Sequence, residues 1–355
     1  MTVLSDILCC PHCNGKINIT DTKWACLNCQ QEWSIDSDGV VRMLEDNYYF
    51  STDRKGVNKL LDELRNMSYE QLLSNIQRLE KDYRDFEYNY CLNPARADWT
   101  ILGNFFNKIV VDLGCGYGSV SIPLQRRAKF VIAVDATLER IKFLSIMAKM
   151  KNAKNVLPIH GDVTKLPLMP QSIDRVIMVG LLEYVSGRLW YSDNLSPRLK
   201  QIAFLKYLHS LLSDDGEIWI GIENQLSPVH FLGGTYHNEL PFTPLLPKFF
   251  ANIVHKLIRK QPHETYLWTR GGYRRLLKQA GFKNIEFYYA FPHYQSPKFI
   301  ASSDKNGIFS KYLDNIGGKS IKLQTGLTLF KFLDKMKIAG LFSPSFFIKA
   351  EKGGQ

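Results

Sequence analysis

The stretch 109–118, Ile-Val-Val-Asp-Leu-Gly-Cys-Gly-Tyr-Gly, constrains the fold of this chain more than any other. Its apolar half, interrupted only by Asp112, predicts a buried β-strand. Glycine then occupies every second position, at Gly114, Gly116 and Gly118. Glycine allows a sharp turn and lets a ligand lie directly against the backbone. A strand that runs through such a turn into a helix is the start of a Rossmann-like βαβ unit.

The spacing of these glycines distinguishes between nucleotide cofactors. A dinucleotide fingerprint requires glycine at its first, third and sixth positions, and the sixth position here is Ser119. A second apolar segment, 129–135, ends in Asp135, which lies 17 residues beyond Gly118. A carboxylate at the end of the second strand can accept hydrogen bonds from both hydroxyls of a ribose. The pattern therefore favours a nucleoside cofactor other than a dinucleotide.

Strands and helices alternate along the rest of the chain. Besides 109–113 and 129–135, strands are predicted over 155–160, 173–179, 217–222, 284–290 and 345–350. Helices are predicted over 95–106, 119–127, 138–151 and 272–280. Alternation of this kind is typical of a mainly parallel sheet with helices packed on it. The predicted fold class is α/β, with a Rossmann-like sheet of seven strands.

Two Cys-x-x-Cys pairs, Cys10/Cys13 and Cys26/Cys29, are separated by 12 residues near the N-terminus. Each pair can supply two thiolates from one tight turn, and four thiolates complete a tetrahedral zinc site. In a reducing compartment this pattern is a metal site more often than a pair of disulfides. Four cysteines leave no open coordination position, so the predicted zinc is structural. The other three cysteines, Cys9, Cys91 and Cys115, are not expected to be ligands.

The composition is that of a globular protein, with 45% hydrophobic and 22% charged residues. No run of about 18 uncharged apolar residues occurs, so no membrane-spanning helix is expected. The N-terminus lacks the features of a signal peptide, and we expect a cytoplasmic protein. The net charge of +11 is uneven, because 19 Lys/Arg and 7 Asp/Glu follow residue 226. A basic last third favours RNA, an anionic membrane or an acidic substrate, unless it is an ordinary solvated face.

The segment 227–270 is an insertion after the fifth predicted strand, where the loops of such sheets face the substrate. One face of its predicted helix, 245–260, is apolar, and lysine and arginine occupy the other faces. Its apolar residues are Leu245, Leu246, Phe249, Phe250, Ile253, Val254, Leu257 and Ile258. Such a helix can be a lid whose apolar side packs on the active site. It can also lie on an anionic membrane surface at its cytoplasmic face.

The ordered motifs Asp-Leu-Gly-Cys-Gly-Tyr-Gly, Val-Asp135, Gly-Asp162-Val, Ile-Asp174-Arg-Val and Leu-Leu-Ser-Asp-Asp-Gly resemble class I S-adenosylmethionine (SAM) methyltransferases over residues 95–290. In that family the acid after the third strand contacts the adenine amino group and its neighbour packs on the ring. The resemblance implies SAM as the cofactor. The expected cofactor contacts are Asp112, Gly114, Cys115, Gly116, Gly118, Asp135, Ala136, Asp162, Val163 and Gly180.

Two narrower resemblances cover other parts of the chain. The motifs Gly-Leu-Leu-Glu-Tyr-Val (180–185), Ile-Glu-Asn (222–224) and Tyr-Tyr-Ala-Phe-Pro-His-Tyr (288–294) resemble a bacterial methyltransferase subgroup associated with cell-surface polysaccharide pathways. Where that subgroup has Pro-Asp-Tyr, this chain has Pro-His-Tyr. Residues 1–45 resemble the small zinc-ribbon family that activates tRNA and translation-factor methyltransferases, here fused to a catalytic domain.

Five segments are expected from these patterns. They are a zinc ribbon (1–45), a helical linker and cap (46–108), a SAM-binding Rossmann-like core (109–226), a lid insertion (227–271) and a C-terminal completion of the sheet with an inserted helical segment (272–355).

The expected function is methyl transfer from SAM to a hydroxyl or amine of a saccharide, a lipid-linked intermediate or another small metabolite. A hydroxyl acceptor benefits from a base, for which Glu183, His230, His237 and His293 are candidates; His237 is preferred, with Glu183 next. An ordinary hydrogen-bonded role is the alternative for each histidine. RNA methylation and a non-catalytic SAM-binding scaffold are the alternative functions. The expected partners are a small-molecule or lipid-linked saccharide acceptor, and a membrane surface or nucleic acid as alternatives.

Overall fold

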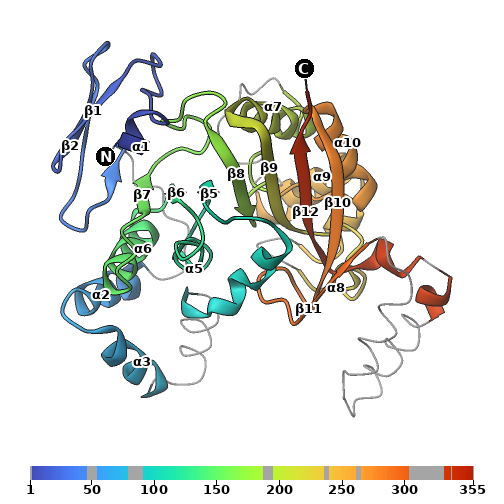
Figure 1. The fold of residues 1–355 in the computed structure, drawn as a ribbon. Helices are drawn as coiled ribbons and strands as arrows, with labels where there is room; N and C mark the ends of the chain where they lie inside the picture. The colour runs from blue at the N-terminus through green and yellow to red at the C-terminus, as the bar shows by residue number, and fades with distance from the viewer. Residues whose placement is uncertain are drawn as a thin grey trace. The chain divides into compact units, whose positions relative to one another are not determined.

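The computed structural model describes residues 2–45, 54–78, 91–186, 195–235, 240–260, 265–303, 332–336 and 338–354 (Figure 1). The chain divides into two compact units. Unit 1 contains residues 1–179 and 207–218, and unit 2 contains residues 180–206 and 219–353. The helix α7 (Pro197–Leu211) and the strand β9 (Leu212–Glu223) each begin in one unit and end in the other.

Unit 1 begins with a small ribbon. After the short helix α1 (Thr2–Ser5), three antiparallel strands follow in the order β1 (Ile17–Ile19), β2 (Lys23–Cys26) and β3 (Glu32–Ser34). Trp24 and Trp33 lie opposite each other on β2 and β3, and both are buried. These two tryptophans are the largest buried side chains of a segment too short to build a sizeable core, which fits its need for an additional constraint.

The core of unit 1 is a parallel sheet in the order β8-β5-β6-β7-β4. Its strands are β4 (Val41–Arg42), β5 (Ile109–Leu113), β6 (Phe130–Asp135), β7 (Val156–His160) and β8 (Ile173–Val179). The helical elements are α2 (Arg54–Leu64), α3 (Tyr69–Arg78), the 3-10 helix η2 (Pro94–Leu102), α5 (Ser121–Leu124) and α6 (Leu138–Met150). The central strands are almost continuously buried, as expected for a parallel sheet covered on both faces.

The ribbon and the parallel sheet are joined by β4. This strand pairs in parallel with β7, so that Val41 lies beside Ile159 and Arg42 beside His160. The carboxylate of Asp38, just before β4, accepts hydrogen bonds from Arg65 at 3.0 and 2.8 Å. These bonds hold the pKa of Asp38 below its ordinary value. The end of the ribbon is therefore an edge of the sheet rather than a free appendage.

Unit 2 has a sheet in the order β11-β10-β12-β9. The strands β10 (Phe282–Phe291) and β12 (Ser345–Lys352) are antiparallel neighbours, and β11 (Phe299–Ser302) pairs antiparallel with the other side of β10 (Figure 1). The remaining elements are α8 (Pro228–Phe231), η3 (Thr243–Leu245), α9 (Lys248–Arg259), α10 (Arg270–Gln279) and η4 (Ala339–Phe342).

The predicted α/β class is confirmed, with a mixed sheet. The seven predicted strands are present as β5 to β10 and β12, but the sheet also contains β4 and β11, so the predicted count of seven strands does not describe it. Two expected helices differ. The helix expected over 95–106 is the 3-10 helix η2, which ends at Leu102. The helix expected over 119–127 is reduced to α5, which has no side-chain N-cap and contains Pro123, a residue without an N–H donor. Among the described residues, no helix combines the length and the apolar character needed to cross a bilayer.

Candidate cofactor site and metal centre

In the glycine turn after β5, one glycine is required by close packing and another has open space beside its backbone. Gly114, Gly116 and Gly118 have φ angles of +65°, +56° and +84°, a region that favours glycine. A Cβ added to Gly118 would lie 2.7 Å from Leu144 Cγ, so close packing against α6 also requires glycine there. A Cβ added to Gly116 would meet nothing within 4 Å. The backbone at Gly116 is therefore accessible to a ligand.

The carboxylate of Asp135 lies at the end of β6, next to this turn. Oδ2 accepts a hydrogen bond from the Gly116 N–H at 2.9 Å, and Oδ1 accepts one from the Thr137 N–H at 2.7 Å. Asp135 is buried except for 6% of its surface. A carboxylate can accept about four hydrogen bonds, so two remain for a ligand.

Asp112 has a different environment from Asp135. It is 2% exposed, and Oδ2 accepts a hydrogen bond from Ser121 Oγ at 2.5 Å. Burial raises the pKa of Asp112 to about 7, helped by the negative charge of Asp135 and opposed by the Ser121 hydrogen bond. Asp112 thus ties the strand to the first turn of α5. No sequence signal pointed to Ser121, because the contact depends on the path of the glycine turn.

The third strand ends at the predicted adenine loop. Asp162 Oδ1 accepts hydrogen bonds from the Thr164 N–H and hydroxyl, both at 2.8 Å, and the neighbouring Val163 is buried. Within the described residues, both of these hydrogen bonds go to Oδ1 and none is made to Oδ2. The nine predicted cofactor residues from Asp112 to Val163 all belong to unit 1, at the ends of β5, β6 and β7.

His160, at the end of β7, was not among the predicted site residues. Its side chain is fully buried; Nδ1 accepts from Arg42 Nε at 3.3 Å, and Nε2 lies 3.0 Å from the carbonyl oxygen of Ala136. These partners place the proton on Nε2, which donates to Ala136. Burial also lowers the pKa of His160, favouring the neutral ring. His160 therefore fixes Ala136, one of the predicted cofactor contacts.

The remaining predicted residues are in unit 2. Gly180 has a φ of +74°, and a Cβ there would lie 2.6 Å from the hydroxyl oxygen of Tyr294. Glu183 is fully buried, and its carbonyl oxygen accepts from the Tyr266 N–H at 3.0 Å. Gln201 donates to the carbonyl oxygens of Leu182 and Tyr266, so this loop is rigidly held. His237 lies outside the described residues.

Two other candidate bases in unit 2 are engaged within the chain. Nε2 of His293 lies 3.3 Å from Oε1 of the buried Glu223, and Nδ1 accepts from the Gln295 N–H at 3.3 Å. Nδ1 of the buried His230 lies 3.0 Å from the carbonyl oxygen of Gln225. Both histidines were predicted as candidate bases, whereas Glu223 was part of the motif Ile-Glu-Asn without a predicted role; its pairing with His293 joins two segments 70 residues apart.

The four predicted zinc ligands lie together in the ribbon. The sulfur atoms of Cys10, Cys13, Cys26 and Cys29 are all within 4.8 Å of one another, with Cys10–Cys29 at 3.6 Å and Cys13–Cys26 at 3.5 Å. A tetrahedral zinc–thiolate site has sulfurs about 3.8 Å apart. The N–H groups of His12 and Asn28 point at Cys10 Sγ and Cys26 Sγ, each at 3.4 Å. The geometry fits a tetrahedral thiolate centre.

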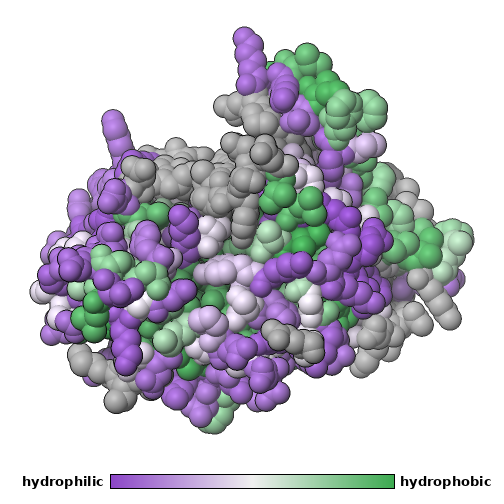
Figure 2. Space-filling view, turned by 90° about the horizontal axis from the view of Figure 1, so that it is seen from above, coloured by the Kyte–Doolittle hydropathy of each residue, from purple (hydrophilic) through white to green (hydrophobic). Residues whose placement is uncertain are grey.

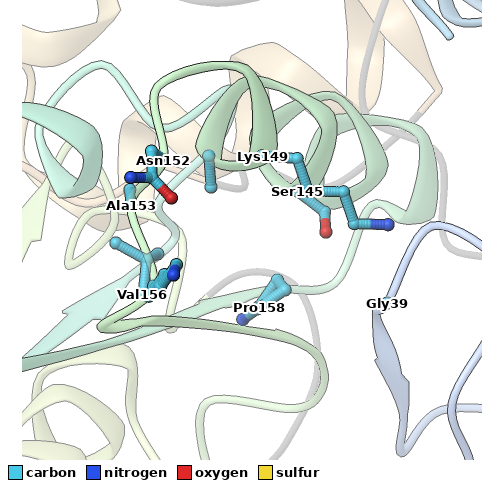
Figure 3. A pocket seen from close by; sticks show the side chains of 9 residues that line it. Gly39, Ser145, Lys149, Asn152, Ala153, Val156 and Pro158 are labelled. Atoms are coloured by element: carbon cyan, nitrogen blue, oxygen red, sulfur yellow. The ribbon is translucent and has the colours of Figure 1, made fainter.

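Unit 1 also has a surface pocket of about 380 Å³ beside the ribbon. Gly39 lines it from the ribbon, Ser145 and Lys149 from α6, and Val156 and Pro158 from β7 (Figure 3). None of the predicted cofactor residues lines this pocket. This pocket is therefore separate from the glycine turn.

Comparison with known proteins supports the assignment of the cofactor. Residues 110–193 match the family model described as "Methyltransferase domain". The chain is 27% identical over 122 residues to a ubiquinone biosynthesis O-methyltransferase of Rickettsia canadensis, covering 33% of this chain and 51% of that protein. It is 30% identical over 92 residues to a 23S rRNA (uracil-C5)-methyltransferase of Photobacterium angustum, covering 25% of this chain and 42% of that protein.

The chain thus spans about half the length of the curated relatives it matches. Among solved structures, magnesium protoporphyrin IX methyltransferase from Synechocystis aligns with a TM-score of 0.43 and 15% identity, over 83% of this chain and 100% of that one. The matched residues 110–193 begin in β5 and include the glycine turn, Asp135 and Asp162. The matched part of the chain, residues 110–193, is therefore a SAM-dependent methyltransferase domain.

Proposed function

We propose that the chain transfers a methyl group from SAM to a hydroxyl or amine of a saccharide, a lipid-linked intermediate or another small metabolite. The observation that carries the cofactor assignment is the open backbone of Gly116 beside the Asp135 carboxylate, within the segment that matches a methyltransferase domain. This arrangement fits a nucleoside whose ribose lies against the turn. The resemblance to the polysaccharide-associated subgroup supports the choice of acceptor.

SAM, when bound, supplies a methyl group on a sulfonium that is already a good leaving group, so the protein mainly has to align the reactants. Asp135 would accept the two ribose hydroxyls, and Asp162 Oδ2 would accept from the adenine amino group, with Val163 against the ring. The Asp112–Ser121 and His160–Ala136 contacts hold these groups in place. His237 and Glu183 remain the proposed groups that receive the acceptor's proton.

Calorimetric titration with SAM tests the cofactor assignment. Asp135→Ala removes two charge-assisted hydrogen bonds, each worth about 1.5–3 kcal/mol, and should weaken SAM binding by at least about 100-fold. Asp62→Ala, which removes an exposed carboxylate in α2 of the same unit, is the matched control and should bind SAM normally. An Asp135→Ala protein that binds SAM as tightly as the wild type would refute the assignment.

We also propose that the four clustered cysteines hold a structural Zn²⁺. The sulfur separations and the N–H groups directed at sulfur support this proposal. Elemental analysis of the purified chain should find one zinc per chain. Cys26→Ser should lower that content sharply, whereas Cys9→Ser, next to a ligand but outside the cluster, should leave it unchanged. Equal zinc in both variants would contradict the ligand set.

RNA methylation is the second candidate. It is favoured by the similarity to 23S rRNA methyltransferases and by the excess of lysine and arginine after residue 226. Methyl transfer to total RNA, measured with radiolabelled SAM, tests it directly. Incorporation that depends on Asp135 would establish this candidate. Binding that falls steeply with salt but yields no incorporation would reflect charge alone.

A further inference from the structure

The helix α9 carries its apolar residues on the outside of unit 2. Phe249, Phe250 and Leu257 are 72%, 56% and 76% exposed, and Ile253 lies between them on the same face at 38%. The buried residues of α9 are Ala251 and His255, which lie on the opposite side of the helix.

Of the two alternatives that the sequence leaves open, a lid with its apolar side packed on the active site and a helix on a membrane surface, this exposure favours the second. The inner side of α9 is anchored by small and polar groups: His255 Nε2 lies 3.4 Å from Thr243 Oγ1, and Lys248 lies over the rings of Tyr266 and Trp268. The apolar stripe is therefore not explained by packing within the described part of the chain. An exposed apolar stripe of this kind marks an interaction surface.

Exposed apolar residues also occur in the elements that neighbour α9. The 3-10 helix η3 contacts both α8 and α9, and Leu232 and Phe242 beside it are 85% and 51% exposed. Phe242 packs close to Gly233, since a Cβ on that glycine would lie 3.0 Å from its ring. Clusters of apolar residues bordered by hydrophilic ones are visible on the face of the molecule shown in Figure 2.

The charges around α9 indicate what covers it. The segment 240–260 contains four lysines and arginines and no acidic residue. Lys256, Arg259 and Lys260 are exposed, at the C-terminal end of the helix. A second copy of the chain would bring two such cationic clusters together, which costs energy. An anionic lipid surface, in contrast, is complementary to both the charges and the apolar stripe.

We propose that α9 is an interfacial anchor that lays its apolar face into the headgroup region of an anionic bilayer. The helix has 12 residues. At about 1.5 Å per residue it is too short to span a membrane, so it lies in the plane of the surface. Cationic side chains at its end contact lipid phosphates. The proposal does not depend on the identity of the methyl acceptor.

Vesicle flotation of the full chain tests the proposal. The wild type should float with vesicles of phosphatidylcholine and phosphatidylserine, and binding should fall as salt is raised. Phe249→Asp/Leu257→Asp removes two large apolar contacts and should weaken binding by at least about 100-fold. Lys256→Glu/Arg259→Glu should weaken it by at least about tenfold on anionic vesicles.

A matched control uses equally exposed apolar residues elsewhere. Ile101 and Phe106 in unit 1 are 81% and 73% exposed, and Ile101→Asp/Phe106→Asp should float like the wild type. SAM affinity, measured on every variant, shows whether the fold is intact and separates this test from that of the cofactor site. Equal flotation of the wild type and Phe249→Asp/Leu257→Asp overturns the proposal. Self-association lost in that variant, without vesicle binding, also overturns it and assigns the face to a second copy.

Discussion

At the scale of single residues, the raised pKa of Asp112 has the clearest effect on the stability of the fold. Its pKa is raised to about 7 in the folded chain, mainly by burial, whereas an unfolded aspartate titrates near 3.9. Between these values the folded state binds more protons than the unfolded state. Its contribution to stability is therefore full below about pH 4 and is lost as pH rises through about 7.

The raised pKa of Asp112 predicts that the free energy of unfolding depends measurably on pH. From pH 5 to pH 8, ionisation of Asp112 should lower the free energy of unfolding by about 2–3 kcal/mol. Asp112→Asn keeps a partner for the Ser121 hydroxyl but cannot ionise, so the decrease should be smaller by that amount. Urea denaturation of both proteins at the two pH values measures it. Parallel pH profiles would show that Asp112 is not the buried titrating group.

The types of the site residues could be predicted at this scale, but their partners could not. The acids at positions 112, 135 and 162 follow from the motif spacing, and their role as cofactor contacts stays a prediction. The partners Ser121, of Asp112, and Arg42, of His160, come from elsewhere in the chain and depend on the fold. No local pattern marks them.

At the scale of elements, the ribbon and the cofactor edge of the sheet are physically connected. The N–H of Cys9, next to the proposed ligand Cys10, donates to the carbonyl oxygen of Pro167 at 3.1 Å, and the Met169 N–H donates to Ile7 at 2.9 Å. The segment 167–169 follows the predicted adenine loop at Asp162. We infer that the metal centre helps to hold that loop.

Removal of the proposed zinc should therefore affect SAM binding at a distance. We expect Cys13→Ser/Cys26→Ser to reduce SAM affinity by about tenfold, or about 1.4 kcal/mol, while unit 1 remains folded by circular dichroism. Cys91→Ser, which changes a buried cysteine outside the cluster, should bind SAM like the wild type. Undiminished affinity after metal loss would limit the centre to stabilising the ribbon.

The longer strands could be predicted because each contains enough apolar residues to form a recognisable sequence pattern. Mainly apolar segments of five to seven residues identify β5 to β8, although Asp112 interrupts β5 and Asp174 and Arg175 interrupt β8. The strand β4 has only two residues and no pattern of its own. The apolar stripe of α9 was predicted, with a lid and a membrane surface as the alternatives for what it faces. An apolar face is stabilised when either protein or lipid removes it from water, and the same sequence pattern suits both.

At the scale of the whole molecule, the two units share structural elements. The chain leaves unit 1 after Val179 and returns at Tyr207, and both α7 and β9 run from one unit into the other. Unfolding one unit would break a helix and a strand that the other also needs. We therefore expect the units to unfold together rather than in two steps.

Chemical denaturation with and without SAM tests this coupling. Tryptophan fluorescence reports on both units, through Trp24, Trp33 and Trp99 in unit 1 and Trp219 and Trp268 in unit 2, and circular dichroism reports on helices and strands. The two signals should give one coincident transition. SAM at about 100 times its Kd should raise the free energy of that single transition by about 2.7 kcal/mol. Asp135→Ala should show no shift, because it removes the ligand contact but not the shared elements. Two separated transitions, or a shift confined to one signal, would mean that α7 and β9 do not couple the units and that the cofactor stabilises unit 1 alone.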